Sequence, residues 1–138
     1  METGGTLAFT LIPASMDINE DYDFMIFGPN ATCRNLGSPI RCSSTNPAAA
    51  RSSNNHTGLR ASSVDVSEGP GPDGDSWLQW MNVQAGETYY LMIDRPIGNS
   101  AFTLNWTGSA TFKKPRAGSD LTLCQNKTAT LNAEETGN

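Results

Sequence analysis

The stretch Asp21–Pro29, with the sequence DYDFMIFGP, decides the fold. Its central residues are aromatic or aliphatic, and a Gly-Pro turn closes it. Side chains alternate along a strand. One face therefore carries Tyr22, Phe24 and Ile26, and the other carries Met25 and Phe27. A short run that is apolar on both faces predicts a central strand buried between two layers.

Four further runs have the length and alternation of strands, at residues 6–12, 77–83, 87–94 and 100–107. In the first run we expect the inward side chains to be those of Leu7, Phe9 and Leu11. In the last run we expect burial of Phe102, Leu104 and Trp106.

The remaining segments are polar. Residues 30–63 show no sustained helical period, which predicts a long surface excursion, and residues 63–66 could form a short strand. Short alternating strands separated by turns predict an all-β fold. We expect an antiparallel β-sandwich with jelly-roll or immunoglobulin-like packing of two sheets and almost no helix.

The amino-acid composition changes near residue 112, and the expected domain organisation follows from this change. We expect a β-sandwich module over residues 1–112 and a basic linker over residues 113–119. Residues 120–138 look like two strands, which either begin a following β repeat or complete the same sandwich. Cys124 lies in this part and has no evident partner. We expect the chain to be an excerpt from a longer precursor.

Composition excludes several function classes. A net charge of −5 argues against a nucleic-acid partner, and no stretch is long and apolar enough for membrane insertion. The sequence has no Gly-x-Ser-x-Gly elbow and no glycine-rich phosphate loop, and His56 is its one histidine. A single histidine among polar loop residues is usually solvated. We therefore expect no enzyme activity.

The cysteines bear on the cellular compartment. Cys33 and Cys42 are nine residues apart, on either side of a turn-rich segment. A small disulfide loop between them would suit an exported protein, and two free thiols would suit a cytosolic one. A zinc site is disfavoured because the spacing is wide and the histidine is remote.

Asp21 and Asp23 project from one face of the decisive strand, with carbons about 7 Å apart. Two carboxylates there repel each other, and Ca²⁺ would relieve them because it collects oxygen ligands in flexible geometry. Asp94, at the end of its own strand, is the third candidate ligand. Alternatively, the acids accept hydrogen bonds from turn amides, or one of them pairs with Arg95. The loop at 73–75 is a second, weaker calcium candidate.

Trp77 and Trp80 are three residues apart and so face opposite sides of a strand. One of them could be exposed and stack against a pyranose ring. The alternative is that each covers a sheet face, because tryptophan is often only partly buried.

Several pieces together carry a family resemblance. They are the run at 6–12, DYDF at 21–24, the loop between the two cysteines, VQAGETYYL at 83–91 and FTLNW at 102–106. Over residues 6–112 the chain resembles the pre-peptidase C-terminal-like β-sandwich modules of large Bacteroidetes surface and gliding adhesins. In that family the module often precedes immunoglobulin-like repeats and a type IX secretion sorting domain. The family's aromatic-rich strand before residue 6 is absent here, and no sorting domain is visible.

The resemblance implies a non-catalytic module of an exported, extracellular cell-surface adhesin, acting in adhesion or as a structural spacer. Its expected partners are a surface polysaccharide or another cell-surface component, and neighbouring β domains of the same long chain. The alternative, from another class, is a carbohydrate-binding module attached to a secreted hydrolase. Tandem β repeats in the parent chain would favour the adhesin, and a catalytic domain would favour the hydrolase.

Overall fold

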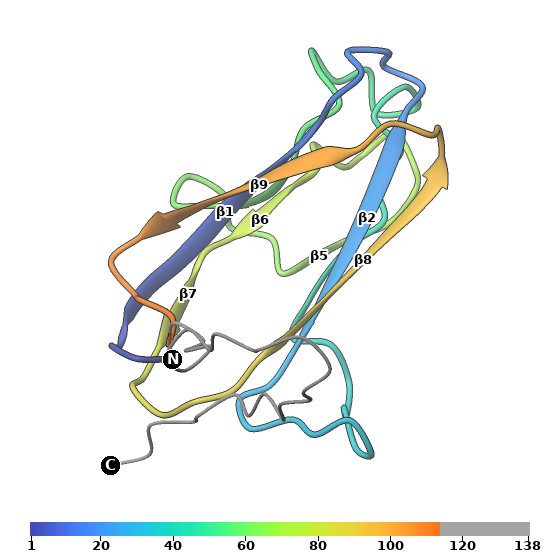
Figure 1. Ribbon diagram of the computed structural model, residues 1–138. Coiled ribbons are helices and arrows are strands. Elements are labelled where there is room, and N and C mark those ends of the chain that lie inside the picture. Colours follow the sequence, from blue (N-terminus) through green and yellow to red (C-terminus); the bar gives the residue numbers. More distant parts are fainter. Residues whose placement is uncertain (114–138) are drawn as a thin grey trace, which may run out of the picture.

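The computed structural model describes residues 1–113, which form nine strands in two facing sheets and no helix (Figure 1). The first sheet contains β1 (Gly5–Pro13), β4 (Thr57–Arg60), β6 (Trp77–Gln79), β7 (Met81–Val83) and β9 (Phe102–Gly108). The second sheet contains β2 (Asp21–Phe27), β3 (Arg41–Ser43), β5 (Ser67–Glu68) and β8 (Tyr90–Ile97). The predicted all-β sandwich is confirmed, and the absence of a helix within 30–63 is confirmed with it.

Strands β1 and β2 are the centres of their sheets. β1 pairs with β9 along one edge and with β4 and β7 along the other, while β6 extends the sheet beyond β4. The order in the second sheet is β5-β3-β2-β8, so the decisive strand is central in its sheet, as predicted. Its expected burial between two layers is wrong, because among the described residues the second sheet packs on one face only and Met25 on the other face is half-buried. Both centres pair antiparallel with every neighbour.

Two outer pairs correct the expectation of wholly antiparallel sheets. β4 pairs parallel with β6, and β3 pairs parallel with β5. Each of these strands has only two to four residues. So short a segment carries no readable period, and its direction depends on how the loops return to the sheet.

The prediction of a long surface excursion over residues 30–63 is also wrong, because β3 and β4 lie within it. Thr57 and Leu59 of β4 are only 2% and 1% exposed. Gly58 lies opposite Thr10, and a Cβ at this position would come within 2.1 Å of the Phe9 carbonyl oxygen. The segment enters the sheet because glycine permits this close approach.

The core lies between β1 and β2. The Phe9 and Phe24 rings meet edge to face with centroids 5.1 Å apart, and Leu11 is fully buried beside them. The predicted inward set on β1 is confirmed, since Leu7, Phe9 and Leu11 are all buried. The expected burial of the last run is wrong in part. Phe102 and Trp106 are each 42% exposed, because β9 is an edge strand with one side open.

Candidate functional site

The three acids predicted from sequence come to neighbouring positions on β2 and β8. Asp23 lies directly opposite Asp94 in the ladder, and an irregularity in register separates Asp23 from Asp21. The Asn46 amide donates a hydrogen bond to Oδ2 of Asp21 at 3.1 Å. The Oδ1 atoms of Asp21 and Asp23 are buried and have no hydrogen-bond partner.

Burial and like charge shape the titration of this cluster. Burial raises the pKa of Asp23 to about 6, and the neighbouring charges of Asp21 and Asp94 act in the same direction. Burial also raises the pKa of Asp21, against the opposing effect of the Asn46 hydrogen bond. The sheet therefore holds carboxylates in a place where their charged forms are disfavoured.

The alternative pairing of these acids with Arg95 is wrong. Arg95 Nη1 instead donates to the Ser100 carbonyl oxygen at 2.5 Å, and its guanidinium lies 5.9 Å from the centre of the Tyr22 ring. Within residues 1–113, the one ion pair joins Arg60 to Asp75.

The geometry falls short of an assembled metal centre. Among the residues that the structure describes, no group of three His, Cys, Asp or Glu side chains is placed to hold a metal ion. Asp94 is exposed, and its Oδ1 accepts a hydrogen bond from the Arg95 backbone amide at 2.8 Å. Two carboxylates with unpaired oxygens fit a cation less completely than the predicted three. Calcium binding stays a prediction.

The structure shows two free thiols where a disulfide was expected. Cys42 lies on β3 opposite Met25, and the exposed Cys33 donates from its Sγ to the Tyr90 hydroxyl at 3.3 Å. The segment between them does fold back, because the Ile40 amide donates to the Ile26 carbonyl oxygen at 2.7 Å. Strand pairing with β2, rather than a covalent bond, closes this loop.

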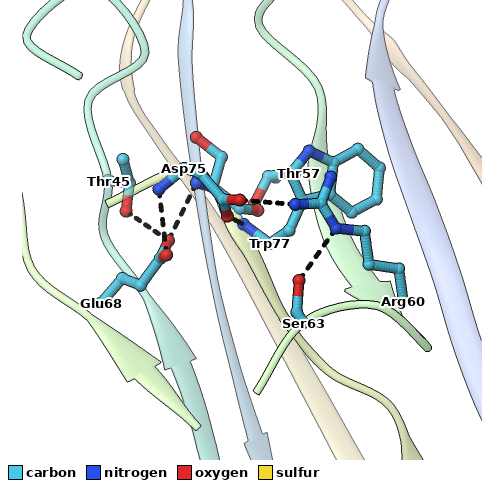
Figure 2. Close-up of polar contacts among 8 residues, drawn as sticks. Thr45, Thr57, Arg60, Ser63, Glu68, Asp75 and Trp77 are labelled. Carbon is cyan, nitrogen blue, oxygen red and sulfur yellow. Dashed lines mark hydrogen bonds and ion pairs between the residues drawn. The ribbon is translucent and has the colours of Figure 1, made fainter. Parts of the chain in front are cut away.

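Trp77 begins β6 and lies in a polar network with Arg60 and Asp75 (Figure 2). The Arg60 guanidinium lies 5.0 Å from the centre of its ring, and Arg60 also pairs with Asp75 at 2.5 Å. A cation over an indole face is attracted by the ring quadrupole. One face of Trp77 is thus already occupied, which disfavours this residue as a stacking platform for a sugar.

The Glu68 carboxylate belongs to the same polar network (Figure 2). Its Oε2 accepts hydrogen bonds from the Thr45 hydroxyl at 2.8 Å and the Ser76 amide at 2.9 Å, and its Oε1 accepts from the Asp75 amide at 3.0 Å. Glu68 belongs to β5 in the second sheet, whereas residues 75–76 lead into β6 in the first. The carboxylate therefore ties the two sheets together.

Trp80 lines a different cleft of about 350 Å³, between β6 and β7 on one side and the turn before β8 on the other. The cleft combines two half-buried aromatic side chains, Trp80 and Tyr89, with the polar groups of Arg41, Gln79, Asn82 and Glu87. The lining exposes more polar than apolar surface, which suits a ligand rich in hydroxyl groups better than the apolar ligands of typical small-molecule pockets.

The polar groups of this cleft are held in place. Glu87 Oε2 accepts from the Gln84 amide at 2.6 Å and from the Tyr89 hydroxyl at 2.7 Å. These hydrogen bonds, the backbone one first, keep the pKa of Glu87 below its usual value. Burial, together with the bond to Glu87, raises the pKa of Tyr89. Arg41 Nε donates to the Gln79 carbonyl oxygen at 2.7 Å, so hydrogen bonds fix side chains on both sides of the cleft.

Sequence reasoning identified Trp80 but missed Tyr89, Glu87 and Arg41. The sequence VQAGETYYL at 83–91 was one of the pieces that carried the family resemblance, and it contains two of these residues. Their proximity to Trp80 depends on how β3 and β8 flank β2, which no local pattern encodes.

Among residues 1–113, which the structure describes, no helix is long and apolar enough to cross a membrane. No protein-family model, curated protein or solved structure matches the chain. The similarity to adhesin modules therefore stays a prediction from the sequence.

Proposed function

We propose that the chain is a non-catalytic β-sandwich module of an exported cell-surface adhesin, and that it contacts surface polysaccharide through the Trp80 cleft. The observation that carries this proposal is the pair Trp80 and Tyr89 beside the amides of Gln79 and Asn82 and the carboxylate of Glu87. Aromatic rings offer apolar faces to a pyranose, and the polar groups offer partners for its hydroxyls.

The hydrogen bonding of the charged groups supports a binding role over a catalytic one. Asp75 accepts from Arg60 and from the Trp77 amide, Glu68 accepts from two backbone amides, and Glu87 accepts from Gln84 and Tyr89. These carboxylates act as fixed acceptors that shape loops. Rigid loops suit a recognition surface, because little ordering is required when a ligand binds.

The same cleft also favours a second candidate, a carbohydrate-binding module attached to a secreted hydrolase. The two functions share a recognition chemistry and differ in what the module is joined to. A tandem array of β domains in the parent chain supports the adhesin, whereas an adjoining catalytic domain supports the hydrolase. Strength and breadth of sugar binding provide a second criterion, because a module that targets an enzyme needs one defined polysaccharide.

A glycan array probed with residues 1–138 tests the cleft. We expect Trp80→Ala to weaken binding at least about tenfold, which corresponds to about 1.4 kcal/mol. Trp77→Ala is the matched control, because its ring is covered by Arg60 and lines another cavity. Circular dichroism confirms that both variants fold.

Weak binding to several surface glycans that depends on Trp80 supports the adhesin. Tight binding to a single polysaccharide that depends on Trp80 supports the hydrolase module. If Trp80→Ala binds as well as the unmodified protein, or if both variants lose the same affinity, the cleft is not the binding site.

A further inference from the structure

The outer edge of β9 is free in the described part of the chain. β9 pairs with β1 over seven consecutive positions, and no other strand of residues 1–113 pairs with it. Edge strands normally carry charges, prolines or bulges that prevent pairing with another chain. β9, with the sequence FTLNWTG, has no charged residue and no proline. β8, the corresponding edge of the other sheet, carries Asp94, Arg95 and Pro96.

The space between these two edge strands has a mainly apolar lining, although Glu87 and Lys113 also line one cavity and Asp94 and Arg95 the other. One cavity of about 360 Å³ is lined by core side chains of both sheets, with Leu7 and Ile26 beside Trp106 and Phe112. A second, of about 430 Å³, is lined by Tyr22, Ile93 and Phe102. β8 and β9 diverge from a short turn into different sheets (Figure 1), and each pairs with only one other strand among residues 1–113.

We propose that β9 pairs antiparallel with β9 of a second copy of this chain, about a two-fold axis that passes through Asn105. This register places Phe102 opposite the partner's Gly108. It places Thr103 opposite Thr107 and Leu104 opposite Trp106, and Asn105 meets its own copy. A two-fold interface of this kind uses one surface patch twice, and so closes at two subunits.

The side chains of β9 complement one another in this register. The large Phe102 ring faces a residue without a side chain, and the apolar Leu104 faces the exposed Trp106 ring. The threonine pair and the central asparagine pair are able to hydrogen-bond across the strands. No like charges meet, because β9 has no charge.

The pairing also covers the open side of the core. Phe102, Leu104 and Trp106 alternate along β9 on one face, and the rings of Phe102 and Trp106 contact the core residues Tyr22 and Phe9. The same three side chains of the second copy extend this inner layer past the edge of the first sheet. There they lie over the apolar gap in front of β8. The second copy therefore contributes both backbone hydrogen bonds and apolar cover.

Sedimentation equilibrium on residues 1–138 over about 1 to 100 μM, a range that captures micromolar dissociation constants, tests the proposal. We expect a monomer–dimer equilibrium for the unmodified chain. Asn105→Lys places two like charges at the axis and should produce a monomer. Asn82→Lys is the matched control, since Asn82 is exposed on β7 at the opposite edge of the same sheet, and it should remain dimeric.

A cross-linking variant tests the register itself. With the three native cysteines replaced by serine, Asn105→Cys should form a disulfide-linked dimer on mild oxidation, because position 105 faces its own copy. Thr107→Cys should not, because it faces position 103.

Three results would overturn the proposal: a monomer throughout the concentration range, a dimer unaffected by Asn105→Lys, or dissociation by Asn82→Lys. The Trp80 cleft shares Glu87 and Tyr89 with the cavity beside Trp106, but no residue of β9 lines it. Glycan binding by a monomeric Asn105→Lys variant would therefore leave the proposed function intact.

Discussion

Replacing Asp23 by asparagine should stabilise the protein at neutral pH. The folded-state pKa of Asp23 is about 6, raised from 3.8 by burial and by the charges of Asp21 and Asp94. A carboxyl group with a raised pKa binds its proton more tightly when folded than when unfolded. Its effect is therefore absent below about pH 4. The free-energy penalty of burying the charged carboxylate grows between the unfolded pKa of 3.8 and the folded pKa of about 6, and it is complete above that pH.

The magnitude follows from the size of the pKa difference. About two pKa units correspond to about 3 kcal/mol at full value. Asp23 is only half-buried, so water screens much of the repulsion, and we expect about 1 kcal/mol. Asparagine keeps the shape, removes the charge, and can donate a hydrogen bond to the unpaired oxygen of Asp21. A gain of this size should raise the midpoint of thermal unfolding by about 4 °C.

The assay is urea unfolding of both proteins between pH 4.5 and 8, followed by tryptophan fluorescence in the presence of a chelator. The difference between Asp23→Asn and the unmodified protein isolates this one group from all other titrations. It should grow with pH and level off above about 7. Asp94→Asn is the control, because Asp94 is exposed and should show a smaller difference. A variant that is less stable at pH 7.5, or a difference that does not change with pH, would refute the reasoning.

Three further predictions follow. If Ca²⁺ binds the acids of β2, chelator should lower the melting temperature and Asp23→Asn should abolish that response, whereas identical melts would remove the site. Iodoacetamide should label Cys33 rapidly and Cys42 slowly, because burial raises the pKa of the Cys42 thiol; a Cys33–Cys42 cross-linked peptide would contradict the structure. Glu68→Ala should destabilise by about 2 kcal/mol, because two backbone amides lose their acceptor, with the exposed Asp73→Ala as the unaffected control in urea unfolding.

Much of the fold was readable from local sequence. β1 carries Leu7, Phe9 and Leu11 on one face, and β2 is aromatic or aliphatic from Phe24 to Phe27, so both were recognisable as buried strands. The positions of β8 and β9 were also predicted to within about three residues, since each is bounded by turn residues. The single strand expected at 77–83 is instead divided at Trp80 into β6 and β7, which pair with different neighbours. Asp21, Asp23, Trp77 and Trp80 were recognisable as candidates, because a charged residue at the edge of a core requires a partner and an exposed aromatic side chain can bind a ligand.

The tertiary structure decided the features that depend on pairing between strands far apart in the sequence. The pairing of β2 with β8 placed Asp94 opposite Asp23. The pairing of β3 with β2 placed Cys42 opposite Met25, whereas Cys33 contacts the Tyr90 hydroxyl. β3 and β5 are too short to show a period, so their parallel pairing arises only when the loops close. Burial on β9 was overestimated for a related reason. Alternation indicates which face of a strand is apolar, but whether another strand covers that face depends on its place in the sheet.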